Sequence, residues 1–403
     1  MKEICKIEYC TGCAVCMNRC EQKAITMQPD NRGFLRPVIA QELCIDCGMC
    51  LEKCPQVKRN APTREGKAYA ALAINDALRG KSSSGGVFSL LADRVLDVGG
   101  VVFGAAMCDD RCVRHVKVES KDELARLRGS KYVQSEIGDC YRQARDCLEA
   151  GKTVLFSGTP CQIDALQNFL DKEYEKLLTV GILCHGVPSP AVLRKFIESK
   201  EQNTDKTVVS INFRDKDPGW SGFSTTIQYN DGTKEIDNSY FYFFVKNYCL
   251  RDSCTRCLYA STRRMEDITI GDFWGYQESA PEHIENDDKG ISLVFVNTEK
   301  GAEAFRKLRR KVDFAVRTID DAVKGNPILL CPVKPNENAR EFWIDFPVMN
   351  WDELVEKYSI SREKKLDTMT AEDREYYARP YKQRHARHLI HCMKSDFLRK
   401  LRR

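Results

Sequence analysis

Eight cysteines near the start of the chain repeat one spacing pattern, C-x2-C-x2-C-x3-C. The first copy consists of Cys10, Cys13, Cys16 and Cys20, and the second, which Pro55 follows, of Cys44, Cys47, Cys50 and Cys54. Cysteine thiolates at this spacing bind a cubane 4Fe–4S cluster, and in two-cluster units the fourth cysteine of each run ligates the other cluster. We therefore assign one cluster to Cys10, Cys13, Cys16 and Cys54, and a second to Cys44, Cys47, Cys50 and Cys20.

A structural zinc site and a disulfide scaffold are the alternatives for the same cysteines. Zinc sites of four cysteines are usually built from two C-x2-C pairs, whereas each run here supplies three close cysteines plus a fourth. Disulfides are disfavoured because the first residues contain no apolar segment of a secretory signal. The pattern therefore favours iron–sulfur clusters.

The composition indicates a globular protein of more than one domain. The chain has 403 residues, of which 42% are hydrophobic and 30% charged, so we expect two or three domains. It has no run of 18 apolar residues, and its twenty cysteines without an export signal indicate a reducing compartment, so a cytoplasmic location is expected. The net charge of +5 is too small to suggest a nucleic-acid partner.

Four regions are expected along the chain. Residues 1–57 form an α+β ferredoxin-like domain, in which two apolar stretches around residues 30–33 form a hairpin. Residues 58–67 are polar and contain proline and glycine, which is typical of a linker. Residues 68–331 form an α/β domain, and residues 332–403 form a polar, basic, helical C-terminal tail.

Strand and helix patterns alternate within the α/β domain. Strands are expected at residues 68–74, 99–104, 153–156, 178–184 and 267–275, and helices at 90–98, 122–128, 137–150 and 162–166. Cys161 follows one of these strands and Cys184 ends the next. Because sites form where parallel strands end, we expect both cysteines at one edge of the sheet. In the tail, helices are expected at residues 336–344, 351–358 and 371–381.

A serine- and glycine-rich stretch precedes the helix at residues 90–98. It comprises Ser83, Ser84, Gly85 and Gly86. Glycines allow close approach of the backbone, and a helix N-terminus supplies N–H donors, which together suit a phosphate group. A serine that caps an ordinary helix explains the same pattern.

Six ordered motifs resemble one known family. They are SSGGVFS from Ser83, GSKYVQS from Gly129, GTPCQ from Gly158, CHGVPSP from Cys184, the pair Cys254 and Cys257, and DITIGD from Asp267. Together with the cysteine runs in front, they resemble the coenzyme F-420 hydrogenase/dehydrogenase beta-subunit family with an N-terminal two-cluster ferredoxin domain. The resemblance covers about residues 67–298. Members are flavoproteins that hold FAD beside a 4Fe–4S cluster.

This resemblance implies two further cofactors, in what is then a flavin-binding domain. The family pattern places a third 4Fe–4S cluster on Cys161, Cys184, Cys254 and Cys257. Cys249 competes by spacing alone but does not fit the motif, and four buried free thiols are the plainer alternative. The FAD contacts are expected at Ser83, Ser84, Gly85, Gly86, Ser130, Lys131, Tyr132 and Gln134.

His185 and the basic stretch at residues 391–403 are each compatible with more than one role. His185 follows Cys184 and is a candidate for relaying a proton, although a hydrogen-bonded structural histidine is equally compatible. Residues 391–403 are basic with a few apolar side chains. They suit contact with an anionic membrane surface or a partner subunit, and a solvated tail is the alternative.

The leading hypothesis is an iron–sulfur flavoprotein oxidoreductase. A one-electron carrier such as ferredoxin exchanges electrons through the clusters with FAD, which exchanges electron pairs with a small organic substrate. A non-catalytic electron-transfer subunit of a larger complex is the alternative, as is an oxidoreductase of the deazaflavin coenzyme F-420. A cluster-bearing interaction protein is a third alternative, and self-association into a homo-oligomer is compatible with each.

Overall fold

A computed structural model describes residues 3–58, 60, 64–202, 204–276 and 283–359. The predicted helix at 371–381 and the basic stretch 391–403 lie outside these residues. Within them, no helix has both the length and the apolarity to cross a lipid bilayer.

The two cysteine runs flank a β-hairpin, as the sequence predicts. Strand β1 (Ile25–Pro29) pairs antiparallel with β2 (Leu35–Ile39). Helix α1 (Val15–Arg19) follows the first ligand loop, and α2 (Met49–Glu52) lies in the second run. The residue before each helix, Ala14 or Gly48, is left-handed, with φ of 60° and 75°. This conformation turns the chain sharply between neighbouring cysteines.

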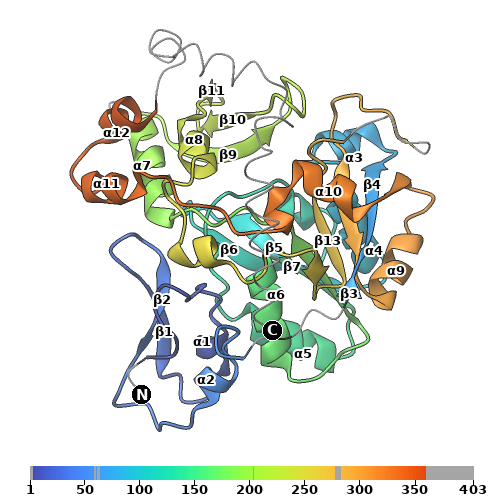
Figure 1. Cartoon of the computed structure of the whole chain (residues 1–403), viewed down its shortest axis with the longest axis horizontal. Helices are drawn as coiled ribbons and strands as arrows, with labels where there is room; N and C mark the ends of the chain where they lie inside the picture. The colour runs from blue at the N-terminus through green and yellow to red at the C-terminus, as the bar shows by residue number, and fades with distance from the viewer. Residues whose placement is uncertain (1–2, 59, 61–63, 203, 277–282, 360–403) are drawn as a thin grey trace.

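A mixed sheet of eight strands forms the centre of the larger domain, which confirms the α/β class (Figure 1). Its order is β15-β4-β14-β13-β8-β7-β5-β6. The four central strands β5, β7, β8 and β13 run parallel, and the outer strands pair antiparallel. In chain order the strands are β4 (Lys67–Ala73), β5 (Val101–Met107), β6 (Val113–Val118), β7 (Val154–Gly158), β8 (Leu177–Ile182), β13 (Ile268–Asp272), β14 (Ser292–Val296) and β15 (Val312–Arg317).

Helices cover both faces of this sheet because its central strands are apolar on both sides. Leu155 of β7 packs toward α4 (Val87–Asp97), whereas Val154 and Phe156 pack toward α5 (Cys140–Glu149) and α6 (Pro160–Leu170). The remaining helices of this domain are α3 (Asp76–Gly80), α9 (Glu299–Arg306) and α10 (Ile319–Gly325), with 3-10 turns η1 (Glu123–Leu127), η2 (Asp252–Arg256) and η3 (Pro327–Leu329). The expected helix at 122–128 is therefore the 3-10 turn η1.

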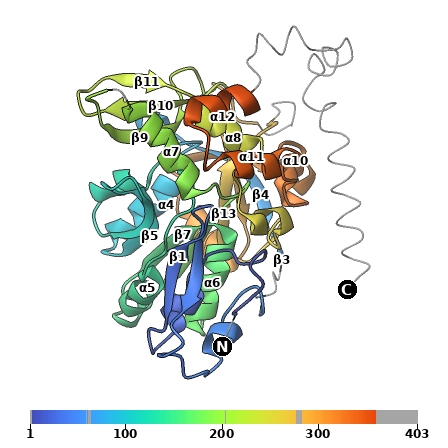
Figure 2. The ribbon, with the colours of Figure 1, turned by 90° about the vertical axis from the view of Figure 1, so that its left-hand side faces the viewer.

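A second, smaller layer was not predicted from the sequence. Strands β9 (Val208–Asp215), β10 (Ser224–Tyr229) and β11 (Lys234–Ile236) form an antiparallel sheet beside α7 (Pro190–Glu201) and α8 (Ser239–Val245). The predicted tail helices α11 (Ala339–Asp345) and α12 (Trp351–Tyr358) share its apolar core (Figure 2). The first part of the expected polar tail is thus a structural component of this layer.

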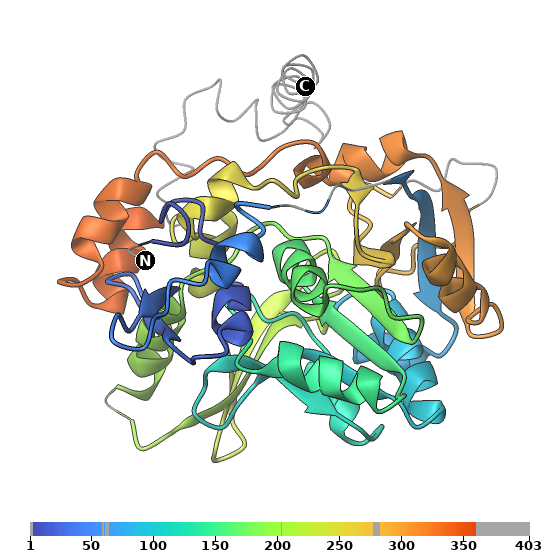
Figure 3. The same cartoon turned by 90° about the horizontal axis from the view of Figure 1, so that it is seen from below.

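The N-terminal unit packs directly on the larger domain. Its helix α1 contacts α6, and the Phe34 ring lies 6.2 Å from the Trp343 ring of α11. Seen from below, the N-terminal unit lies between α6 and the helices α11 and α12 (Figure 3). The expected linker contains a short strand, β3 (Arg64–Glu65), which pairs with β12 (Arg263–Arg264). Backbone pairing therefore ties the connecting segment to the larger domain.

Truncation of Phe342 tests the contribution of the C-terminal helices. This side chain of α11 is fully buried against Phe243 of α8 and Tyr358 of α12, so Phe342→Ala should lower the free energy of unfolding by about 3–5 kcal/mol. Val348 is 79% exposed, and Val348→Ala should change it by less than about 0.5 kcal/mol. Denaturant titration followed by circular dichroism measures both. Equal effects would contradict a structural role for these helices.

Candidate functional site

The parallel strands β7 and β8 end side by side and bring two cysteines to one edge of the sheet, as predicted. Gly158 of β7 is paired with Gly181 of β8, so Cys161 and Cys184 follow within three residues of the paired positions. Thr159 caps α6 through a capping box with Gln162, and its hydroxyl lies 3.1 Å from Cys161 Sγ. The start of α6 is thereby held in place beneath the Cys161 thiol.

Cys254 and Cys257 complete a group of four thiols. All four line one cavity, which we call the cysteine cavity. Burial first, with a contribution from neighbouring cysteines, raises the pKa of Cys161 to about 11 and that of Cys254 to about 12. Burial, then Cys254, Cys161 and Cys257, hold the pKa of Cys184 well above its ordinary value. Backbone N–H groups of Val187 and Tyr259 donate to Cys254 Sγ and Cys257 Sγ at 3.3 and 3.4 Å.

Cys249, the competing ligand by spacing, lies elsewhere. It is fully buried in the apolar core between the small sheet and α7. Burial is what raises the pKa of Cys249 to about 12, and the four thiols of the cysteine cavity do not contribute to this shift. The structure therefore separates Cys249 from the group at the sheet edge.

The N-terminal cysteines form an inner and an outer group. The inner group is Cys10, Cys13, Cys16 and Cys54, all buried. Burial, then Cys10 and Cys54, raise the pKa of Cys16. Sequence reasoning missed Cys5, whose side chain hydrogen-bonds to both Cys10 and Cys54. Nothing in its spacing separates Cys5 from an ordinary packing cysteine.

The outer group lies toward the surface. Burial, then Cys47 and Cys44, raise the pKa of Cys50. Cys20 packs with Cys50 against the small core that also holds Cys16 and Cys54. Cys47 is exposed, and its neighbour Ile45 is 65% exposed. Cys54 of the second run thus lies with the first three cysteines of the first run, toward the interior, which is compatible with the crossed pairing.

The described cysteines are not arranged to bind a single metal ion such as zinc. Over the described ranges, no three His, Cys, Asp or Glu side chains converge closely enough to hold one metal ion. The thiolates of a cubane cluster bind different iron atoms and stay farther apart than the ligands of one zinc ion. Four thiols around a shared cavity are therefore compatible with a cluster.

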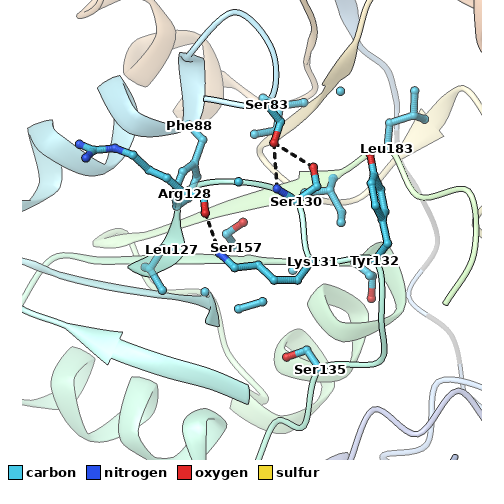
Figure 4. Close-up of a pocket in the computed structure, with 18 of the residues that line it drawn as sticks. Ser83, Phe88, Leu127, Arg128, Ser130, Lys131, Tyr132, Ser135, Ser157 and Leu183 are labelled. Atoms are coloured by element: carbon cyan, nitrogen blue, oxygen red, sulfur yellow. Dashed lines mark hydrogen bonds between the residues drawn. The ribbon is translucent and has the colours of Figure 1, made fainter. Parts of the chain in front are cut away.

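A second cavity, of about 280 Å³, lies at the predicted phosphate loop (Figure 4). We call it the serine cavity. Of the eight predicted cofactor residues, seven line it: Ser83, Ser84, Gly86, Ser130, Lys131, Tyr132 and Gln134. Gly85 does not line the cavity, and a Cβ atom at this position would lie 2.3 Å from Ala71 O. Gly86 is the residue before α4, and no serine side chain caps this helix, so the alternative of a serine N-cap is not observed.

Lys131 is an unusual side chain of the serine cavity. Its Nζ donates to the carbonyl oxygens of Arg126 and Arg128 at 2.8 and 2.7 Å. Burial lowers the pKa of Lys131 to about 7, because these carbonyls supply partial charge but no full counter-charge. The amine can therefore gain or lose its proton near neutral pH.

A third cavity, of about 1240 Å³, opens beside the other two. We call it the aromatic cavity, since Tyr132, Phe241, Phe244 and Trp274 are among its lining residues. Three residues line all three cavities and form their shared walls: Thr159, Leu183 and Val187. Sequence reasoning named Tyr132 but missed Phe241, Phe244 and Trp274, because these residues come from segments far from it in the chain.

His185 lines both the cysteine cavity and the aromatic cavity. Its Nε2 lies 2.7 Å from Asn247 Oδ1, while Asn247 Nδ2 donates to Lys334 O. This orientation of the amide requires Nε2 to carry the ring proton. Burial lowers the pKa of His185, so the ring is neutral at pH 7 and Nδ1 is an acceptor. The geometry therefore favours a structural role over a proton donor at Nδ1.

Comparisons with known proteins agree with the motifs. Residues 151–322 match the family of coenzyme F420 hydrogenase/dehydrogenase, over the C terminus of the beta subunit. Residues 151–322 therefore belong to that family. Residues 9–57 match the 4Fe-4S dicluster domain, so the N-terminal unit is an iron–sulfur domain in front of an oxidoreductase family domain.

Among solved structures, one match is the F420-reducing NiFe hydrogenase complex from Methanosarcina barkeri, in a xenon-derivatized form. The sequence identity to the matching polypeptide of that complex is 18%, and the TM-score is 0.44. The match covers 74% of this chain and 94% of the other. No curated protein sequence matches the chain.

His115 of the serine cavity provides a test of its buried surroundings. The His115 ring forms hydrogen bonds with Ser135 Oγ and Ser157 O, and burial lowers the pKa of His115 to about 4. Because the unfolded histidine binds a proton below about pH 6.5 and the folded one does not, stability should fall as pH drops from 6.5 to 4. The expected loss is about 3 kcal/mol.

The matched variant is His115→Gln, which keeps a donor and an acceptor but does not titrate. Its unfolding free energy should depend less on pH over that interval, measured by denaturant titration at successive pH values. The same pH slope in the variant and the wild type would contradict a neutral buried His115.

Proposed function

We propose that the protein is an iron–sulfur flavoprotein oxidoreductase that passes electrons between a one-electron carrier and a two-electron organic substrate. One observation carries this proposal: the cysteine, serine and aromatic cavities share the walls Thr159, Leu183 and Val187. A cluster, a flavin and a substrate in these cavities would be immediate neighbours. Such contact is what conversion of single electrons into electron pairs requires.

The residues of the cysteine cavity fit a third 4Fe–4S cluster. Cys161, Cys184, Cys254 and Cys257 supply four partly buried thiols around one cavity, which is the full donor set of a cubane cluster. Burial raises the pKa of the Cys161, Cys184 and Cys254 thiols, so ionisation there needs a nearby positive charge such as iron. Two backbone N–H groups already point at sulfur.

The inner N-terminal group lies next to this cavity. Burial raises the pKa of Tyr141 and Tyr259, and both Cys13 and Cys161 add to each shift. Both tyrosines therefore lie close to one thiol of each group. We propose the order outer cluster, inner cluster, third cluster. A one-electron carrier such as ferredoxin would then dock near the exposed Cys47 and Ile45.

The residues of the serine cavity fit FAD. The uncapped N-terminus of α4, the Ser83 and Ser130 hydroxyls, and the Lys131 amine are donors suited to a diphosphate. When bound, FAD supplies the exchange of one electron at a time with clusters and of electron pairs with an organic substrate. Tyr132 and Leu183 would separate it from the aromatic cavity.

The aromatic cavity is the proposed substrate site. Arg214 is held there by Asp272, 2.9 Å away, and its guanidinium carbon lies 3.7 Å from the centre of the Phe223 ring. These contacts fix the orientation of Arg214 in a cavity that Lys131 also lines. The apolar rings that line this cavity exclude water from the bound substrate.

Removal of one thiol from the cysteine cavity tests the third cluster. Anaerobically prepared wild-type protein should contain about twelve irons per chain, since three cubane clusters hold four each. Cys184→Ala should lower this to about eight, whereas Cys249→Ala, at a buried cysteine outside the cavity, should leave it unchanged. Iron and sulfide quantitation measures both. About eight irons in the wild type would contradict the third cluster, and a colourless protein would contradict the whole proposal.

The pH dependence of FAD binding tests Lys131. If protonated Lys131 pairs with the diphosphate, binding should weaken as pH rises from about 7 to 9, by up to about tenfold per unit. Lys131→Met should bind FAD more weakly and with little pH dependence, while the exposed Lys172→Met should resemble the wild type. Fluorescence titration of the flavin-free protein measures these affinities. A wild-type affinity that is constant with pH would contradict the pairing.

A further inference from the structure

Arg251 is a fully buried arginine between the N-terminal unit and the larger domain. Its side chain is 1% exposed, the largest of the nearly inaccessible side chains in the described residues. It stands just before η2, which carries Cys254. An arginine here buries a permanent positive charge, because its guanidinium stays protonated in proteins.

All the donated hydrogen bonds of Arg251 go to neutral groups or to sulfur. Nε donates to Cys10 O at 2.7 Å, Nη1 to Gln134 Oε1 at 3.1 Å, and Nη2 to Leu35 O at 2.8 Å. Nη2 also lies 3.7 Å from Cys10 Sγ. None of these acceptors is a carboxylate. Arg36, a cation that acts electrostatically on Arg251, is itself paired with Asp30.

Besides the Phe34 ring, 5.4 Å from the guanidinium carbon, the neighbours of the guanidinium include cysteines from two different groups. Cys10 belongs to the inner group and Cys254 to the cysteine cavity, and each acts electrostatically on Arg251. Arg251 also lines the cysteine cavity itself. The arginine therefore lies between the two proposed cluster sites.

The close approach of the two units at Arg251 depends on a glycine. A side chain at Gly12, whose φ is +67°, would meet Arg251 Nη1 at 2.8 Å and Gln134 Nε2 at 2.4 Å. Only glycine combines this backbone conformation with so near a contact. The loop between Cys10 and Cys13 is thus shaped to receive the guanidinium.

A buried guanidinium without a carboxylate is costly unless an anion compensates it. A cubane cluster with four thiolates carries net negative charge, which grows when the cluster is reduced. We propose that Arg251 is the positive charge shared by the inner and third clusters, and that it makes both easier to reduce. It is a positioning residue for electron transfer inward from the outer cluster. This inference rests on the cluster assignment of the proposed function.

Three variants separate the charge of Arg251 from its packing. Arg251→Met removes the charge, and Arg251→Lys keeps it but loses the planar fork. Arg256→Met is the matched control, because Arg256 lies between Cys254 and Cys257 but is exposed to solvent, where water screens its charge. Anaerobic redox titration of the full chain, followed by electron paramagnetic resonance, measures the midpoint potential of each cluster.

The expected result is a shift to more negative potential for two of the three clusters in Arg251→Met. Potentials near those of the wild type are expected in Arg251→Lys and Arg256→Met. The outer cluster, whose cysteines are not among the described contacts of Arg251, serves as the internal reference. Unshifted potentials in Arg251→Met, or equal shifts in Arg256→Met, would overturn the inference.

If Arg251→Met does not assemble its clusters, the lysine variant decides. Assembly with near wild-type potentials in Arg251→Lys supports a role of the charge, and cluster loss there too would show a purely structural role and overturn the inference. A wild-type protein without clusters would instead refute the proposed function.

Discussion

The parallel pairing of β7 with β8 is the constraint on which the site depends. Register between Gly158 and Gly181 makes both strands end at the same level. The segments that follow them carry Cys161 and Cys184 and also supply the shared walls Thr159 and Leu183. A shift of this register would separate the two thiols and displace the walls of all three cavities. The site is therefore a property of the sheet edge rather than of any single loop.

Charge is distributed unevenly around this edge. The thiols of the cysteine cavity are partly buried, and neighbouring cysteines help to raise the pKa of Cys161, Cys184 and Cys254. In contrast, Arg214 and Arg264, both buried near the cavities, are paired with Asp272 and Glu266. Arg251 differs from them because its hydrogen bonds go to neutral oxygens and its Nη2 lies 3.7 Å from Cys10 Sγ, with no carboxylate as an acceptor. The arrangement suits negatively charged clusters, which would neutralise the arginine and permit the thiols to ionise.

The iron–sulfur domain is built into the larger domain rather than attached to it by a free linker. Thr11, from its first cysteine run, lines both the serine and cysteine cavities. Arg142 of α5 donates to the carbonyl oxygens of Met17, Asn18 and Cys20 around the end of α1. Such contacts hold the inner cysteine group at a constant distance from the sheet edge. Electron transfer depends steeply on distance, so this rigidity has a direct functional value.

Local patterns in the sequence were sufficient for the hairpin, the parallel strands, both described tail helices and the cysteine runs. Each of these depends on spacing within a short segment: thiols that wrap one cluster, or apolar residues that alternate along a strand. Likewise, the small residues from Ser83 to Gly86 marked the loop that lines a cavity. The β9-β10-β11 sheet and the short strand β3 were not predicted, because weak local patterns there are overridden by tertiary pairing, and the helix expected at 122–128 is the 3-10 turn η1.

By itself, then, the sequence determined which cysteines group within each run and that the chain carries an iron–sulfur domain before an α/β domain. Only the tertiary structure decided that the Cys10 group faces inward, that Cys249 is separate, and that Arg251 lies between two thiol groups. It also decided that three cavities share one set of walls. The physical reason is that these contacts join residues far apart in the chain. Their burial, and the lack of a carboxylate partner for Arg251, are set only when the sheet has folded.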